Sequence, residues 1–584
     1  MAVRTFETTA VQHAVAGLLA LGFSAAFSTA AWAVDPPNAG QVLESLPPVT
    51  SPSRGEIEPV ATPAAATARS TAPEGPTVRV ASFAFTGNTI ISAEALSALV
   101  QGYQGRDLSI DELNEATAVI QAAYREKGYF LAQAFLPAQK PVDGVVTVRI
   151  VEGQVGATKV NLQPGTRVSQ AQADGYMALL PSGTVISERG VERPLLLLSD
   201  LPGVSVNSVL KPGATPGSAD LVVDVSNKGN AVGGNVFLDN HSSKFTGQYR
   251  LGLNVEARSV LGFGEVMNLT AMQSFGGSNP AGETKVARLG LVLPLGNLGT
   301  KASFNYTDFD YEVGGTFASA RPLGVARVAS MLVQHPYIRS RNATHFFHGG
   351  FDHKLVDDFS AGVSTNRREL KVYHLGLNGD FRDNLGGGGL NSYSIRTTFG
   401  ENKIKTPSAL SSDQTVNGLG TNGNFTKVGL QYLRLQKLSF GAGHALMLSA
   451  RAQLAMDNLD GSEKVSLGGP NAVRGFSVGA ASADDVFLGT IEYRYTVPGL
   501  NWLGGSVTLS SFYDHGSAKL NHKPAANMTA ANRYTLSSLG VGMNWLKRND
   551  FQMRLDVASR VGSERYQDDE RSDTHWWLSL QKWF

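Results

Sequence analysis

A catalytic serine is the first chemistry that the residue pattern suggests. Gly475-Phe476-Ser477-Val478-Gly479 has the Gly-x-Ser-x-Gly spacing that exposes a nucleophilic serine in many hydrolases. That chemistry requires a strand, a sharp turn and a helix around the serine, with a histidine and an acid within reach. No helical pattern follows Ser477, so the segment does not predict an active site.

Three histidines are the next candidates, because imidazole is a common metal ligand. His345 and His348 lie three residues apart, with His353 nearby. On a strand that spacing places two side chains on opposite faces, and the sequence contains no His-Glu-x-x-His motif. The chain has no Cys, which excludes thiolate ligands and disulfides. We therefore predict histidines on the inside of a barrel or at its interface, with no metal, no cofactor and no enzymatic activity.

An arginine and an aspartate offer a third kind of chemistry, a charge-assisted contact. Arg474 lies in residues 457–484, the longest weakly patterned stretch between well-patterned segments, and Asp514 lies two such segments later. Alternation turns Asp514 and Phe512 to the same side. If the stretch folds inward, the guanidinium could meet the carboxylate in a bidentate contact that fixes its position. The alternative, which spacing leaves open, is an exposed arginine and an unrelated aspartate.

The segments that would position this pair alternate with a period of two from Ala231 to Phe584, without a long apolar run. One segment has Leu251, Leu253, Val255 and Ala257 on one face and Arg250, Asn254, Glu256 and Arg258 on the other. Only a closed barrel can place such strands in a bilayer, with the charged face towards a wet lumen. At roughly ten residues per strand plus turns, the stretch accommodates about sixteen strands.

The N-terminal part of the chain predicts export. Residues 1–33 form a secretory signal peptide, with an apolar stretch at Ala14–Ala26 and a small-x-small cleavage site at Ala31–Ala33. Residues 34–46 could form a short helix, and residues 47–76 are a linker rich in Pro, Ala and Thr. The helix could dock at a remote site as a plug, or it could be a frayed terminus. The residues leave both interpretations open.

Two small α+β modules are predicted before the barrel, at residues 77–152 and 153–228. In each, one strand is followed by two helices and two further strands. The first strand is expected from Val78 to Phe85, with a bulge where the alternation slips at Ala81-Ser82. Edge strands of such modules could accept a peptide strand from a client, although a rigid spacer that binds nothing is the alternative.

Short motifs in the barrel region resemble those of a known family. The loop motif is Val473-Arg474-Gly475-Phe476, similar to VRGY/F, and the strand motif is Phe512-x-Asp514-x-Gly516, similar to FxDxG. The segment Leu238-Asp239-Asn240-His241 and the terminal Phe584 fit as well. These motifs resemble the two-partner secretion outer-membrane transporters, the FhaC/ShlB-like TpsB family within the BamA-like superfamily of POTRA-plus-barrel proteins. Phe476 stands where that family commonly has Tyr.

The resemblance implies a membrane all-β fold, a barrel of about sixteen antiparallel transmembrane strands at residues 229–584, preceded by two α+β POTRA-like modules. It places the barrel in the bacterial outer membrane and the modules in the periplasm. It also implies that residues 34–46 plug the pore, that residues 457–484 fold inward so that Arg474 meets Asp514, and that the C-terminal Phe serves barrel assembly. The implied partners are a large secreted TpsA-like exoprotein bound through the POTRA modules, outer-membrane lipids, and the barrel-assembly machinery during biogenesis.

The function implied is translocation of one exoprotein, with secretion or activation at the cell surface. The sequence has no nucleotide-binding Gly-x-x-x-x-Gly-Lys-Ser/Thr loop, so no nucleotide hydrolysis is expected. A net charge of +1 gives no reason to expect a nucleic-acid partner. A BamA-like assembly factor is the alternative, and a passive porin or adhesin is a third reading. Two modules, rather than more or none, favour the transporter.

Overall fold

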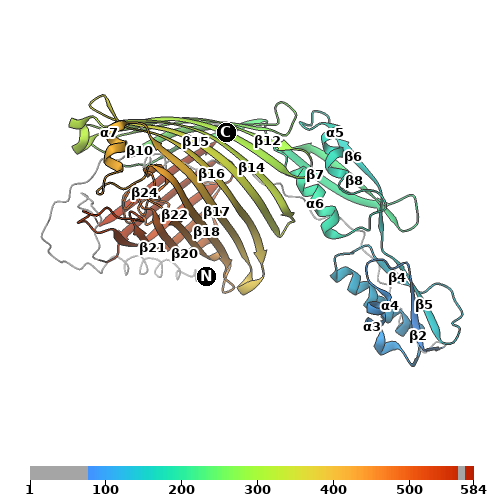
Figure 1. Cartoon of the computed structure of the whole chain (residues 1–584). Coiled ribbons are helices and arrows are strands. Elements are labelled where there is room, and N and C mark those ends of the chain that lie inside the picture. Colours follow the sequence, from blue (N-terminus) through green and yellow to red (C-terminus); the bar gives the residue numbers. More distant parts are fainter. Residues whose placement is uncertain (1–76, 563–572) are drawn as a thin grey trace, which may run out of the picture.

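The computed structural model describes residues 77–562 and 573–584 of the chain. The predicted signal peptide, plug helix and linker, at residues 1–33, 34–46 and 47–76, lie outside the described residues. Figure 1 shows a large barrel with two small modules extending from one of its ends. The module that contains α5 and α6 adjoins the barrel, and the module that contains α3 and α4 lies farther away.

The barrel is a closed antiparallel sheet of sixteen strands, β9 to β24, which confirms the predicted fold class. Each strand pairs with its neighbours in sequence, and β24 pairs with β9 to close the ring. The strands are β9 Val232–Asp239, β10 Tyr249–Arg258, β11 Val266–Phe275, β12 Glu283–Leu295, β13 Thr300–Glu312, β14 Leu323–Arg339, β15 Ala343–Ser360, β16 Val363–Asp383, β17 Gly389–Ile404, β18 Gly423–Lys437, β19 His444–Ala455, β20 Asp485–Trp502, β21 Gly505–Lys519, β22 Arg533–Lys547, β23 Phe551–Arg560 and β24 Thr574–Trp583.

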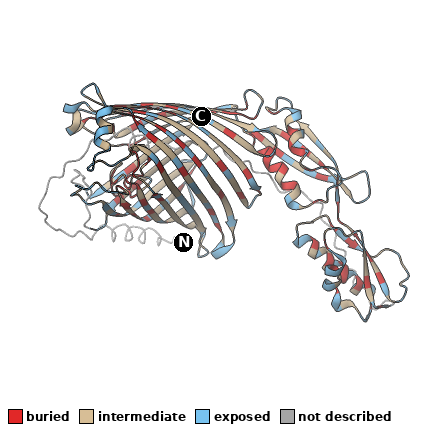
Figure 2. Ribbon diagram, in the orientation of Figure 1, coloured by how far each residue is buried: buried red, intermediate tan, exposed pale blue. Residues whose placement is uncertain are grey.

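The two faces of the barrel follow the alternation of the sequence. On β10, Leu251 is exposed on the outer face, whereas its neighbour Arg250 is buried on the inner side against Asp239. Figure 2 shows the same mixture of exposed and buried positions along the strands. None of the helices in the described ranges is long and apolar enough to cross a membrane. The charged inner face and apolar outer face are those of a barrel that crosses a bilayer with strands.

The chain end takes part in barrel closure. Phe584 donates its backbone N–H to the Gly234 carbonyl at 3.0 Å and accepts from the Gly234 N–H at 3.1 Å. Asn240 continues the seam where β9 has ended, because its side-chain amide accepts from the Leu578 N–H at 2.8 Å and donates to the Trp576 carbonyl at 2.9 Å. Backbone groups at the seam are therefore paired, as the bilayer requires.

The first module differs from the predicted order of elements. Its elements are β1 Val78–Val80, β2 Ser82–Thr86, α3 Ala93–Leu99, β3 Arg106–Leu108, α4 Ile110–Glu126, β4 Gln133–Phe135 and β5 Val145–Val151. The expected bulge at Ala81 is wrong: the strand is divided there, because β1 pairs with β3 whereas β2 pairs with β5 in a separate sheet of order β2-β5-β4. The three-residue β3 is too short for periodicity to reveal.

A buried carboxylate holds this module together at its end. Glu152 accepts hydrogen bonds from the Thr89 N–H at 2.6 Å, the Ile90 N–H at 2.8 Å and the Tyr124 hydroxyl at 2.7 Å. Burial alone would raise the pKa of Glu152, but these hydrogen bonds outweigh it and hold the pKa below its ordinary value. The ionised carboxylate therefore ties the turn after β2 to helix α4.

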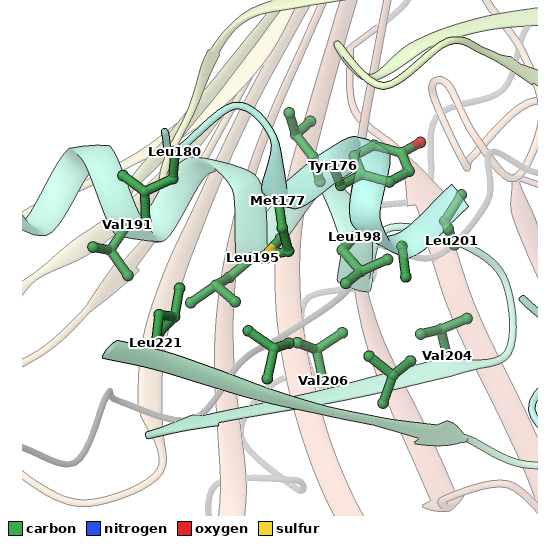
Figure 3. Packing of buried hydrophobic residues seen from close by; sticks show 14 of the residues in the cluster. Tyr176, Met177, Leu180, Val191, Leu195, Leu198, Leu201, Val204, Val206 and Leu221 are labelled. Carbon is green, nitrogen blue, oxygen red and sulfur yellow. The ribbon is translucent and has the colours of Figure 1, made fainter. Parts of the chain in front are cut away.

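The second module packs two helices on a three-stranded sheet of order β6-β8-β7. Its elements are β6 Gln154–Leu162, α5 Gln170–Met177, α6 Glu188–Ser199, β7 Val204–Pro212 and β8 Ser218–Asn227. Figure 3 shows the shared core, in which Met177, Leu195 and Leu198 of the helices face Val206 of the sheet. Burial of each such side chain contributes about 1.5–3 kcal/mol. The module therefore has a hydrophobic core of its own.

The second module is fixed to one end of the barrel by buried polar contacts. Arg339 at the end of β14 makes a bidentate ion pair with Asp200 after α6, with N–O distances of 2.7 and 2.8 Å. Its side chain is 4 % exposed. Arg193 on α6 donates to the Pro336 carbonyl at 3.0 Å. These contacts hold the module beside the short turns of the barrel, opposite the end that carries the long loop after β19.

Candidate functional site: a loop inserted in the barrel

The segment between β19 and β20, residues 456–484, folds back into the barrel. We call it the inserted loop. Its two arms pair at Val465 and Ala483, whose N–H and C=O groups exchange hydrogen bonds of 3.0 and 2.9 Å. Farther along, the Val473 N–H donates to the Leu467 carbonyl at 2.8 Å. The loop therefore has an ordered backbone.

One side of the inserted loop is apolar and packs on the barrel wall. The buried residues of this cluster come from the loop and from the inner face of β20 to β22: Val465, Leu467, Val473, Phe476, Ala480, Ala481, Ala483, Val486, Leu488, Ala518 and Leu536. Removal of this surface from water drives the loop against the wall. The packing explains why Val473 and Phe476 flank the charged residue of the loop motif.

Arg474 lies at the centre of a buried ionic network. Its Nε and Nη2 donate to the two carboxylate oxygens of Asp514 on β21 at 2.9 and 2.8 Å. Its Nη1 donates to Glu492 on β20 at 2.9 Å, and Asp556 on β23 lies at 3.6 Å. Arg474 is 3 % exposed and Asp514 is 1 % exposed. Charge-assisted bidentate pairs of this kind specify geometry as well as energy.

Further groups of the wall complete the surroundings of Arg474. The Phe512 ring lies under the guanidinium, 3.1 Å from its Cζ to the ring centroid. Trp577 on β24 donates its indole N–H to the Arg474 carbonyl at 2.8 Å. Asp514 also accepts from Thr490 at 2.9 Å and from Ser538 at 3.2 Å. Arg474 is therefore held through its side chain and its backbone by groups on four strands, β20, β21, β23 and β24, while Ser538 on β22 supports its partner Asp514.

The two motif glycines allow the loop to approach the wall. A Cβ on Gly475 would lie 2.7 Å from the Ser538 Cβ, and a Cβ on Gly516 would lie 3.0 Å from Val473 and 2.9 Å from Leu488. A methyl group at either position would push the loop away from β21 and β22. Both motifs therefore require glycine for the same physical reason, the close contact between the loop and the wall.

The structure brings together Arg474 and Asp514, the two residues singled out for an ionic contact. Sequence reasoning did not identify Glu492, Asp556 or Trp577 as partners of Arg474. A signal existed, because alternation places all three on the same inner face as Asp514. Alternation cannot say which of the inward charges the loop will reach, since that depends on strand stagger around the barrel.

The other candidate residues lie elsewhere. Phe584 lies at the barrel seam. His345 interacts with Tyr393, His348 with Asn378 and His353 with Glu369, so the three histidines have separate partners. Within residues 77–562 and 573–584, no group of three or more His, Asp or Glu is placed to hold a metal ion. Ser477 is followed by turns, not by a helix.

A closed sixteen-stranded membrane barrel with an ionically fixed loop inside it and α+β modules at one end is the architecture of an outer-membrane β-barrel protein. Residues 217–545 match the family described as haemolysin secretion/activation protein ShlB/FhaC/HecB, and residues 78–153 match the POTRA domain of ShlB type. The chain belongs to this family. It is therefore an outer-membrane transporter of two-partner secretion, not an enzyme, and its POTRA region lies in the periplasm. Both the predicted family and the predicted location are confirmed.

Individual relatives agree with the family. The chain is 26 % identical over 505 residues to the heme/hemopexin transporter protein HuxB of Haemophilus influenzae, with 85 % of each chain covered. It is 24 % identical over 427 residues to the outer membrane transporter CdiB of Escherichia coli O6:K15:H31, covering 69 % of this chain and 66 % of CdiB. The solved structure of CdiB from Escherichia coli has the same fold, with a TM-score of 0.70 at 21 % identity, covering 89 % of this chain and 93 % of that one.

Proposed function

We propose that this transporter captures one large TpsA-like exoprotein in the periplasm through its POTRA modules and passes it through the barrel to the cell surface. The observation that carries the proposal is the buried attachment of the second module to the barrel. A cargo segment bound to that module is held beside the entrance to the lumen. Extended cargo would then meet an inner wall of polar and charged side chains, and no nucleotide is required.

The sheet edges of the modules suit the capture of an extended segment. Among the described residues, β7 pairs only with β8, and β2 pairs only with β5, so each presents one edge without a strand partner. A peptide strand added to such an edge gains main-chain hydrogen bonds, which depend little on its side chains. This mode of binding fits a cargo recognised while it is unfolded.

The inserted loop has a gating role in this proposal. The Arg474–Asp514 pair holds the loop in one position in the lumen, and the loop motif and strand motif supply the close fit. A predicted plug helix at residues 34–46 and the linker at residues 47–76 would add a second, removable obstruction. Phe584 would serve recognition by the barrel-assembly machinery, and the outer face would contact outer-membrane lipids.

Release of the second module from the barrel tests the proposal. Asp200→Ala leaves Arg339 without its carboxylate at a nearly closed interface, so we expect the module to detach and secretion of the exoprotein to fall several-fold. The cargo is measured as the large protein that disappears from the medium when the gene for this chain is deleted. Protease cleavage between β8 and β9 reports detachment.

Asp224→Ala is the matched control, because among the described residues that exposed carboxylate on β8 bonds only to Asn161, within the module. We expect it to secrete normally. Normal secretion by Asp200→Ala, together with increased cleavage between β8 and β9, would contradict a role for the attached module in delivery.

A further inference from the structure

The inserted loop carries a second set of buried charges near its start. Asp460 pairs with Arg368 on β16 at 2.9 Å, and Glu463 pairs with Lys354 on β15 at 2.7 Å and with Lys427 on β18 at 2.8 Å. We call residues 460–463 the loop root and residues 471–476 the loop tip. Asp460 and Glu463 are 4 % and 5 % exposed, so both carboxylates are as buried as the Arg474 network.

The loop backbone is also bound at the root. Lys354 donates to the Ser462 carbonyl at 3.4 Å, and Lys427 donates to the Glu463 carbonyl at 2.6 Å. Gln453 on β19 donates to the same Glu463 carbonyl at 3.1 Å. The root is therefore fixed by side chains from four strands of the wall, β15, β16, β18 and β19, through both its charges and its main chain.

The root and the tip contact different parts of the barrel wall, and the loop carries opposite charges at the two places. At the root the loop supplies the acids and the wall, on β15, β16 and β18, supplies the bases. At the tip the loop supplies the base and the wall, on β20, β21 and β23, supplies the acids. Among the described residues, no ion-pair partner is shared between the two sets. Energetic effects at sites that share no partner are usually additive, so the two attachments should open independently.

We propose that the loop root is an independent anchor, which keeps the loop in the lumen when the tip leaves Asp514. The tip is then the moving part, and the start of the loop is its pivot. Glu463 and Asp460 are positioning residues in this view. Their relevance to transport rests on the proposed gating role of the loop, but the anchoring itself does not.

The absence of native cysteine allows each attachment to be observed alone. A spin label at Asn471→Cys reports the tip, where the native side chain is exposed, and a label at Gly461→Cys reports the root. In the purified full chain we expect Arg474→Ala to shift the tip label from an immobile to a mobile spectrum and to leave the root label unchanged. Glu463→Gln should do the reverse.

The control is Asp457→Asn, which makes the same kind of carboxylate-to-amide change in the same loop. Its ion pair with Lys523 is exposed, at 39 % and 66 % for the two side chains, so neither label should shift. If Glu463→Gln does not assemble, Lys427→Gln weakens the same cluster from the wall and leaves Glu463 paired with Lys354.

Two results would overturn the inference. One is that Arg474→Ala mobilises both labels, which would mean that the loop has a single attachment at its tip. The other is that neither root variant mobilises the root label. Label mobility is measured on the protein itself, so failure of the secretion proposal would be seen separately, as unchanged cargo in the medium.

Discussion

Asp514→Ala should release the loop tip and reduce secretion of the exoprotein strongly. The change leaves the Arg474 guanidinium, 3 % exposed, without its bidentate partner. Loss of one partner of a buried ion pair typically costs about 3–5 kcal/mol, because the other charge remains buried. Glu492 and Asp556 can compensate only in part, since each contacts a single nitrogen of Arg474.

The release can be measured in the purified full chain as increased mobility of a spin label at Asn471→Cys, in parallel with exoprotein in the medium of cells that carry the variant. Thr508→Ala is a suitable control on the inner face of the same strand, because in the part of the chain that the structure describes its hydroxyl bonds only to Thr496. A tip-label spectrum equal to that of the protein with Asp514 in place would show that the Arg474–Asp514 pair does not hold the tip.

A lysine introduced on β18 should reduce folding strongly on the lipid-facing side and have little effect on the lumen-facing side. Leu430 on β18 is exposed on the outer face, and the adjacent Gln431 is exposed towards the lumen. Leu430→Lys places a charge against lipid, at a cost of up to about 2–4 kcal/mol near the bilayer midplane. Gln431→Lys places the same charge in water and should fold normally.

Folding into lipid vesicles, followed by the shift in electrophoretic mobility between heated and unheated samples, measures both variants. We expect a reduced folded fraction for Leu430→Lys alone. Equal folded fractions for the two variants would mean that β18 does not face lipid as its alternation indicates.

The barrel could be predicted from the sequence because the residue pattern that defines each strand is local. Each strand must put apolar residues outside and polar residues inside, so a period of two marks every strand, and the bilayer requires closure. The division of the first strand at Ala81 could not be predicted, since it depends on a three-residue partner beyond helix α3. The pairing of β1 with β3 and of β2 with β5, and not a local pattern, divides this strand.

The site was predictable only at its tip. Arg474 and Asp514 stand in motifs whose glycines and aromatic residue mark a close contact. The root gives no such mark: Asp460 and Glu463 are ordinary acids of a polar loop, and their partners Arg368, Lys354 and Lys427 lie on three different strands. Only the stagger of the closed barrel brings them together.

The proteins secreted with and without this chain test the central claim most directly. We expect one large exoprotein to disappear from the medium of cells that lack the chain, while other outer-membrane proteins assemble normally, and Arg474→Ala to cause a partial loss of the same exoprotein. If many outer-membrane proteins fell together and no single exoprotein was lost, the chain would act as an assembly factor, and the proposed secretion of one partner would be contradicted.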